Sequence, residues 1–172
     1  SPLQIYYCHQ QQLLFPMTIY SHSRISTFEQ CPQKFKFKYI DLIKPDFEET
    51  IEGFLGKKVH ESLEWLYNNK SSQIDLDKLI NHFINLWNNG FNQNIKIIRQ
   101  GLPTDHYLNK GIKFLINYFI KNAPFKENTI ATEKKIFVNL DSEGNYKMIG
   151  YIDRLVHHKE TNIFEIHDYK TS

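Results

Sequence analysis

The final third of the sequence changes its pattern, and this change limits the fold more than any other feature. From residue 128 on, three strand-like runs alternate with the segments DSEGN and HKETN, whose Asp, Gly and Asn residues are typical of turns. The preceding residues follow helical spacing instead. We therefore expect an α+β fold, with N-terminal helices packed on a C-terminal antiparallel three-strand meander.

The helices are predicted from capping residues and from the spacing of apolar side chains. Residues 23–40 read as two short helices: Ser23 or Ser26 can cap the first, Glu29 can complete a capping box with Ser26, and Pro32 opens the second. Further along, apolar side chains repeat at intervals typical of one helix face, at Val59, Leu63 and Leu66. The pattern predicts further helices over residues 54–69, 75–100 with an interruption near Gly90, and 104–122.

With 172 residues, the chain has the length of one domain that can bury most of its apolar surface. We assign residues 17–172 to that domain and residues 1–16 to an extension or a disordered arm. A net charge of +2 gives no general argument for a polyanionic partner, so any such argument depends on local patches. Two cysteines are too few for a disulfide framework and fit the reducing cytoplasm. No apolar run reaches the roughly 18 residues of a membrane span, so we expect no membrane partner.

The hairpin formed by the last two strands brings charged residues onto one face. If its turn centres on Glu160 and Thr161, Asp153 lies opposite Asp168, and Lys170 lies on the same face. Two carboxylates roughly 5 Å apart repel each other unless a cation lies between them or one is protonated. Mg²⁺ and Mn²⁺ favour such oxygen ligands, and a lysine beside them can hold water and neutralise phosphoryl charge. The alternative is a surface cluster in which Lys170 is only a counter-ion.

Four segments in this order resemble the RecB-like nucleases of the PD-(D/E)xK superfamily. They are SHSRISTFEQCPQKFKFKYI (21–40), GKKVHESLE (56–64), GYIDR (150–154) and IHDYKT (166–171). The first resembles the start of this domain in RecB/AddB-type exonucleases, and Cas-type RecB-like nucleases are close relatives. The resemblance implies a restriction-endonuclease-like core. That core is incomplete, because relatives continue after the last strand into a Q-x-x-x-Y helix and further strands, so we interpret the domain as C-terminally truncated.

Carried over to these positions, the resemblance implies a metal site and a catalytic lysine. Asp153, Asp168 and His60 become the metal-binding residues, and Lys170 becomes the catalytic lysine. Glu133 opens the first strand, where relatives often carry an acid, although it also fits a solvated strand-end charge. Glu64 lies one helical turn after His60 and fits a helix-flank or supporting role.

The implied cofactor is Mg²⁺ or Mn²⁺. In iron–sulfur relatives, a cysteine placed like Cys31 joins three more cysteines after the last strand, and four thiolates are required. The sequence holds no cysteine after Cys31. We therefore expect no iron–sulfur cluster in this chain. Cys31 is either a small buried hydrophobe or a lone ligand.

The function implied by the resemblance is a metal-dependent DNA nuclease, with exonuclease action in repair or recombination; CRISPR adaptation is equally compatible. Candidate DNA contacts are Lys57, Lys58, Lys34, Lys36 and Lys38, which also fit a role in solubility alone. The alternatives are an inactive or truncated nuclease-fold module that binds DNA or a helicase or recombination subunit, and an unrelated α+β metal-binding or scaffold protein. The exposed edge of the last strand suits self-association.

Overall fold

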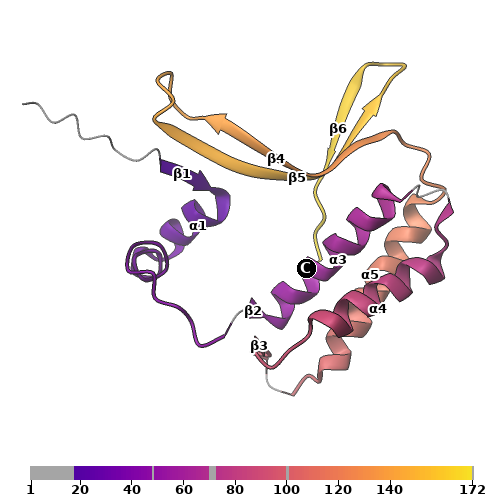
Figure 1. Cartoon of the computed structure of the whole chain (residues 1–172), viewed down its shortest axis with the longest axis horizontal. Helices are drawn as coiled ribbons and strands as arrows, with labels where there is room; N and C mark the ends of the chain where they lie inside the picture. The colour runs from indigo at the N-terminus through magenta and orange to yellow at the C-terminus, as the bar shows by residue number, and fades with distance from the viewer. Residues whose placement is uncertain (1–17, 48, 70–72, 100, 172) are drawn as a thin grey trace, which may run out of the picture.

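The computed structural model describes residues 18–47, 49–69, 73–99 and 101–171. The predicted arm at residues 1–16 and Cys8 lie outside these ranges. The mixed α+β class is confirmed (Figure 1). In chain order the elements are β1 (Thr18–Ser21), α1 (His22–Gln30), α2 (Pro32–Phe35), the π-helical turn η1 (Lys36–Ile40), β2 (Glu49–Thr50), α3 (Ile51–Asn68), α4 (Leu76–Gly90), β3 (Ile95–Lys96), α5 (Thr104–Asn122), β4 (Thr129–Asn139), β5 (Tyr146–His158) and β6 (Ile163–His167).

The main sheet is built around the long strand β5. Strand β4 pairs antiparallel with β5, β6 pairs antiparallel with its C-terminal part, and β1 pairs parallel with its N-terminal part. The antiparallel meander is therefore confirmed. The parallel strand β1 is an addition that the sequence did not predict, because four residues that pair only with a distant segment carry too little local pattern.

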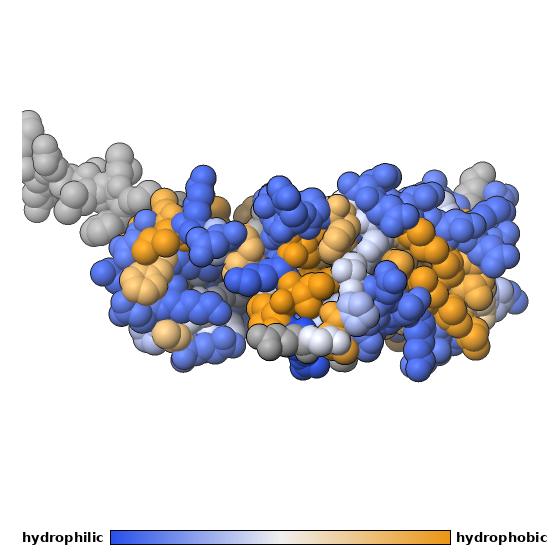
Figure 2. All heavy atoms as spheres, turned by 90° about the horizontal axis from the view of Figure 1, so that it is seen from below, coloured by the Kyte–Doolittle hydropathy of each residue, from blue (hydrophilic) through white to orange (hydrophobic). Residues whose placement is uncertain are grey.

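The hydrophobic core lies mainly within a bundle of α3, α4 and α5, which Figure 1 shows on one side of the sheet with α3 nearest to it. Its fully buried side chains include Val59, Leu63 and Leu66 of α3, Phe83 of α4 and Leu115 of α5. The spacing that predicted α3 thus identifies its buried face. Seen from below, hydrophobic side chains gather in the middle of the face and over the helices at the right (Figure 2).

Two details of the predicted helices are wrong. The helix predicted over residues 75–100 ends at Gly90 and does not resume. The Asn92 side chain accepts a hydrogen bond from the Asn94 amide at 2.8 Å, which holds a turn before β3 pairs with β2. The cap of α1 is Ser21, whose Oγ accepts from the Arg24 amide at 3.2 Å. Ser26 instead accepts a hydrogen bond from the Gln30 side chain.

The close packing of α5 against its neighbours requires a glycine at position 111. A Cβ atom there would lie 2.3 Å from Phe83 Cζ and 2.8 Å from Leu55 Cδ1. We expect Gly111→Ala to lower the free energy of unfolding by about 1–3 kcal/mol, because overpacking outweighs the gain in helix propensity of roughly 1 kcal/mol. Urea denaturation measures this change. Asn109→Ala, at an exposed position of the same helix, is the control. A Gly111→Ala variant as stable as the control would contradict the packing argument.

The sheet leaves much apolar surface exposed. Its exposed side chains include Phe137, Tyr151, Phe164 and Ile166, and within the described ranges β6 pairs only with β5. Self-association through β6 stays a prediction. Among the described residues, no helix has the length and apolar character needed to cross a membrane.

Candidate metal centre

The first residue of the candidate site is His60, in the middle of α3. This helix begins after Thr50, whose side-chain oxygen accepts a hydrogen bond from the Gly53 amide at 3.3 Å. Val59 and Leu63 on either side of His60 are fully buried, which fixes the rotation of the helix about its axis. His60 therefore projects from the side of α3 that faces the strands, with its side chain half-buried.

Asp153 and Glu133 come from neighbouring strands. The pairs Thr132–Arg154 and Lys134–Ile152 flank them, so Glu133 of β4 faces Asp153 of β5. Asp153 is buried at 9% relative exposure. Glu133 has a backbone φ of +45°, a conformation that costs a non-glycine residue energy and that occurs preferentially at functional sites.

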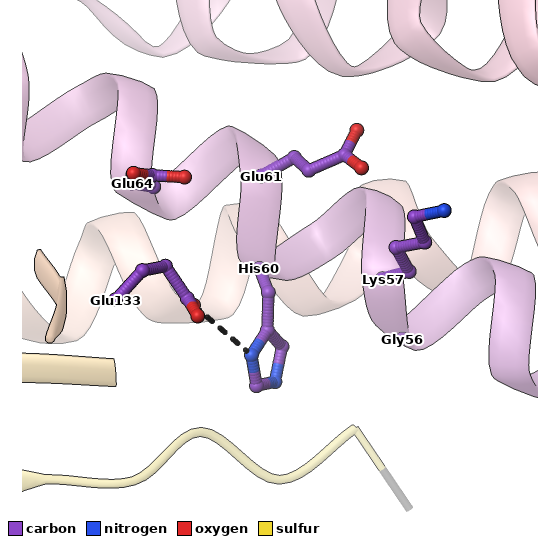
Figure 3. A pocket seen from close by; sticks show the side chains of 6 residues that line it. All are labelled: Gly56, Lys57, His60, Glu61, Glu64 and Glu133. Carbon is purple, nitrogen blue, oxygen red and sulfur yellow. Dashed lines mark ion pairs between the residues drawn. The ribbon is translucent and has the colours of Figure 1, made fainter. Parts of the chain in front are cut away.

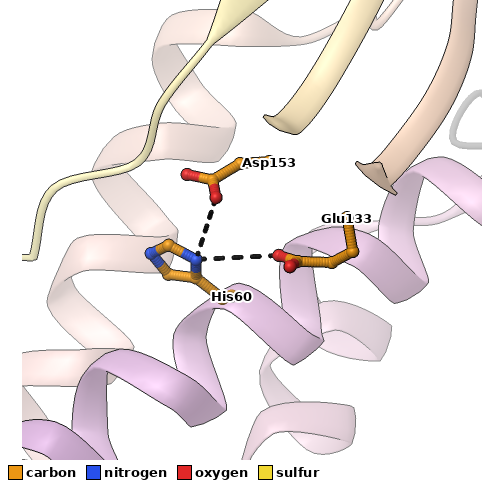
Figure 4. Close-up of side chains that lie close together, drawn as sticks. All are labelled: His60, Glu133 and Asp153. Carbon is orange, nitrogen blue, oxygen red and sulfur yellow. Dashed lines mark ion pairs between the residues drawn. The ribbon is translucent and has the colours of Figure 1, made fainter. Parts of the chain in front are cut away.

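These three side chains converge on one point (Figure 4). His60 Nδ1 lies 3.5 Å from Asp153 Oδ1 and 3.8 Å from Glu133 Oε1. One ligand atom from each residue lies within 4.8 Å of the other two. Three donor atoms at such separations can share one cation, because metal ligands must meet at roughly 2.0–2.6 Å from the ion.

The main chain of Tyr169 contacts two of the three residues. Its amide donates to Asp153 Oδ2 at 2.5 Å, and its carbonyl oxygen lies 3.1 Å from His60 Nε2. A carbonyl oxygen can only accept, so His60 Nε2 carries the proton. Nδ1 is the ring nitrogen that faces Asp153 and Glu133. This arrangement of the second ring nitrogen is the usual way in which proteins orient a metal-binding histidine.

The electrostatics of the cluster favour a cation. The pKa of Glu133 is raised, first by partial burial and then by the negative charge of Asp153. The His60 lone pair and both carboxylates are acceptors with no donor between them in the neutral tautomer. Either a proton on Nδ1 or a divalent cation between the three groups would remove the repulsion among these acceptors. Two carboxylate oxygens and one imidazole nitrogen form a donor set that suits a divalent ion such as Mn²⁺ or Mg²⁺.

Asp168 and Lys170 lie next to this cluster but outside it. The observed pair Arg154–His167 is the predicted register, and the next step along it would bring Asp168 beside Asp153. However, β6 ends at His167, and the exposed Asp168 carboxylate lies 2.6 Å from Lys170 Nζ. This contact raises the pKa of Lys170. The roles predicted for Asp168 and Lys170 therefore stay predictions.

A comparison with protein families shows which class of protein this cluster belongs to. Residues 19–172 match the family model described as the PD-(D/E)XK nuclease superfamily. The chain belongs to this superfamily. Neither a search of curated proteins nor a search of solved structures returned a match.

PD-(D/E)XK nucleases use divalent metal ions to hydrolyse phosphodiester bonds, and the nuclease fold implies a DNA substrate. The convergent donors of His60, Glu133 and Asp153 fit such an ion. The sequence predicted Glu133 only as a minor candidate, because it could equally be a solvated strand-end charge. The structure brings it into the cluster. The main-chain contacts of Tyr169 have no sequence signal at all.

A cavity of about 390 Å³ opens beside the cluster of His60, Glu133 and Asp153 (Figure 3). His60 and Glu133 point toward one another in it, and Lys57 lines the same cavity. Glu64 also lines it and adds to the raised pKa of Glu133. Lys58 lies differently, because its Nζ is 2.7 Å from Glu61 Oε2 and its side chain is largely buried.

The other predicted DNA contacts lie on α2 and η1, away from the bundle (Figure 1). Lys34, Lys36 and Lys38 are exposed, and Lys36 pairs with Asp41 at 3.7 Å. Cys31, half-buried, precedes them and caps α2, with its sulfur accepting from the Lys34 amide at 3.4 Å. This capping role of Cys31 was not predicted from the sequence.

Arg154, adjacent to Asp153 on β5, has a structural role. Its side chain is fully buried and lies 4.2 Å from the centre of the Tyr67 ring. The guanidinium donates to Glu127 at 2.7 Å and lies 2.9 Å from His167 Nε2. It therefore ties β5 to β6, to the segment before β4 and to α3.

Proposed function

We propose that this protein is a Mg²⁺- or Mn²⁺-dependent DNA exonuclease of the RecB/AddB-like type that acts in repair or recombination. The observation that carries the proposal is the convergence of His60, Glu133 and Asp153 on one point beside Asp168 and Lys170. The exonuclease type and the pathway are supported by the four segments that resemble RecB-like nucleases.

In this proposal His60 Nδ1 and the carboxylates of Asp153 and Glu133 hold the metal ion. We infer that Asp168 completes the set, because continuation of the β5–β6 register by one residue would bring it beside Asp153. In the structure its carboxylate pairs with Lys170 instead. When bound there, a divalent ion would lower the pKa of a water and neutralise charge on the phosphate. Tyr169 keeps His60 and Asp153 in place through its main chain.

Lys170 acts on the substrate in this proposal. Its exposed ammonium group is close enough to Asp168 to share the phosphate site, and it donates to the attacking water or to a non-bridging oxygen of the phosphate. Removal of one donor of this kind typically lowers kcat by about 100-fold or more. Lys57 lines the cavity beside His60 and Glu133, and in this proposal it contacts the neighbouring phosphate.

A second function is favoured by the position of Asp168. A nuclease-fold module that only binds DNA or a helicase subunit would have no need to bring this carboxylate into the cluster, and in the structure it lies outside. Such a module would keep the fold and the exposed lysines of α2 and η1 without hydrolysis.

Degradation of labelled single- and double-stranded DNA with Mg²⁺ or Mn²⁺ tests the proposal. Asp168→Ala and Lys170→Ala are expected to lower the rate by about 100-fold each. The controls are Lys159→Ala and Glu160→Ala, exposed residues in the turn of the same hairpin, which should cleave like the original chain. Linear DNA should be degraded and circular DNA resist, as exonuclease action requires. Equal rates for all four variants would refute catalysis by this site and support the binding module.

A further inference from the structure

A groove runs along α5, separate from the cavity of the metal centre. It consists of two adjoining cavities of about 270 and 180 Å³. Leu55, Lys110 and Thr171 line both of them. The lining residues of α5 extend from position 106 to position 117, which corresponds to roughly 16 Å of helix.

The groove combines a hydrophobic floor with cations at its rim. Leu55 and Leu102 contribute to the floor, and Arg99, Lys110 and Lys113 are exposed around it. In the parts of the chain that the structure describes, none of these three cations forms an ion pair, in contrast to Lys36, Lys58 and Lys170.

The acidic residue of the groove is already engaged. Glu52 lines the larger cavity and accepts a hydrogen bond from the Tyr107 hydroxyl at 3.1 Å. Glu52 contributes one negative charge against the three positive charges of Arg99, Lys110 and Lys113, so the rim of the two cavities is positive. The rim therefore complements a chain of phosphates, and the hydrophobic floor suits the apolar parts of sugars and the faces of unpaired bases.

The groove meets the metal centre at one point. Gly56 lines the cavity of the metal centre, and a Cβ atom on Gly56 would lie 3.4 Å from Thr171 Oγ1. Thr171 lines both groove cavities and directly follows Lys170. A strand whose scissile phosphate lies beside Lys170 can therefore continue over Thr171 into the groove.

We propose that this groove binds the sugar–phosphate backbone of one DNA strand and leads it to or from the metal centre, with Arg99 and Lys110 as phosphate contacts. The inference rests on the proposed nuclease function for the identity of its ligand. It adds a binding surface that the sequence motifs do not include, since Arg99 and Lys110 lie in none of them.

Binding of a fluorescein-labelled 20-nucleotide oligo(dT), measured by anisotropy with Ca²⁺ in place of Mg²⁺ at several KCl concentrations, tests the proposal. Arg99→Glu/Lys110→Glu should weaken binding at least about 10-fold at 0.1 M salt. It should also reduce the slope of log K against log salt by about 1.4, the value for two phosphate contacts to a single strand. The matched control, Lys121→Glu/Lys126→Glu, makes the same charge change beyond the far end of the groove and should stay within about twofold of the original chain.

Each outcome has a separate meaning. Equal weakening by both double variants, or none by either, overturns the groove. A loss that affects duplex DNA more than the single strand overturns the single-strand assignment. Binding that depends on Arg99 and Lys110 without any cleavage in Mg²⁺ or Mn²⁺ retains the groove and refutes the nuclease proposal. If the groove variants bind and cleave DNA like the original chain, the nuclease proposal is retained and the groove is refuted.

Discussion

Replacing Asp153 with asparagine is expected to lower the affinity for Mn²⁺ by more than about 100-fold and to reduce cleavage at least as strongly. Loss of a residue that merely supports a metal ligand typically costs 10–100-fold, and Asp153 is a proposed ligand itself. The change keeps the shape of the side chain, and an asparagine oxygen can still accept the Tyr169 amide that now bonds Asp153 Oδ2 at 2.5 Å.

The same substitution should leave the metal-free fold as stable or make it more stable. Asp153 contributes to the raised pKa of Glu133. A carboxyl whose pKa is raised by folding stabilises the fold only while it is protonated, and this contribution is lost as pH rises through the folded pKa. Without the Asp153 charge the pKa of Glu133 falls, so less stability is lost at neutral pH.

Isothermal titration with Mn²⁺ and urea denaturation in EDTA measure the two effects of Asp153→Asn. Glu160→Gln, an exposed acid in the turn after β5, is the matched control and should change neither quantity. Unaltered Mn²⁺ affinity in Asp153→Asn would remove this residue from the metal centre. A large fall in stability would show that its role is structural.

Replacing Arg154 with methionine is expected to lower the free energy of unfolding by about 3 kcal/mol. Removal of one partner from a buried ion pair costs about 3–5 kcal/mol, and the lower figure applies because Glu127 is partly exposed and can hydrate. The substitution also removes the contact with the Tyr67 ring and leaves His167 without its neighbour at 2.9 Å.

Urea denaturation measures the stability of Arg154→Met, and an NMR titration follows His167. Burial and the Arg154 charge lower the pKa of His167, so this pKa should rise when the charge is removed. Arg154→Lys keeps the charge but not the planar fork, and an intermediate loss of stability is expected. Lys135→Met, on the exposed part of β4, should change stability by less than about 0.5 kcal/mol. An Arg154→Met variant as stable as this control would contradict the structural role.

The closing hairpin shows what the sequence could predict. Its short turn at Glu160 and Thr161 permits one register, and the observed pair Arg154–His167 follows it. The turn between β4 and β5 is longer and permits more than one register. Because a shift of one residue reverses every side chain, the position of Glu133 opposite Asp153 could not be derived from the pattern.

Long-range contacts account for the remaining differences. Strand β1 exists through its pairing with β5, which lies more than a hundred residues away in the chain. The end of α4 depends on the turn that the Asn92 side chain stabilises, although Gly90 indicated in the sequence where the helix would be interrupted. His60 could be predicted as a ligand only from the resemblance, because a histidine on a helix flank has many ordinary roles.

The two main-chain contacts of Tyr169 make the metal centre sensitive to chain length. The amide reaches Asp153 and the carbonyl oxygen reaches His60, while the neighbouring positions on either side carry Asp168 and Lys170. Both groups belong to the main chain, and the buried Tyr169 ring adds a third contact, because it packs edge-on against His60 with 5.6 Å between ring centroids. An inserted or deleted residue would move the amide, the carbonyl and both charged side chains together. The number of residues between β6 and Lys170 is therefore as much a part of this site as the identity of its side chains.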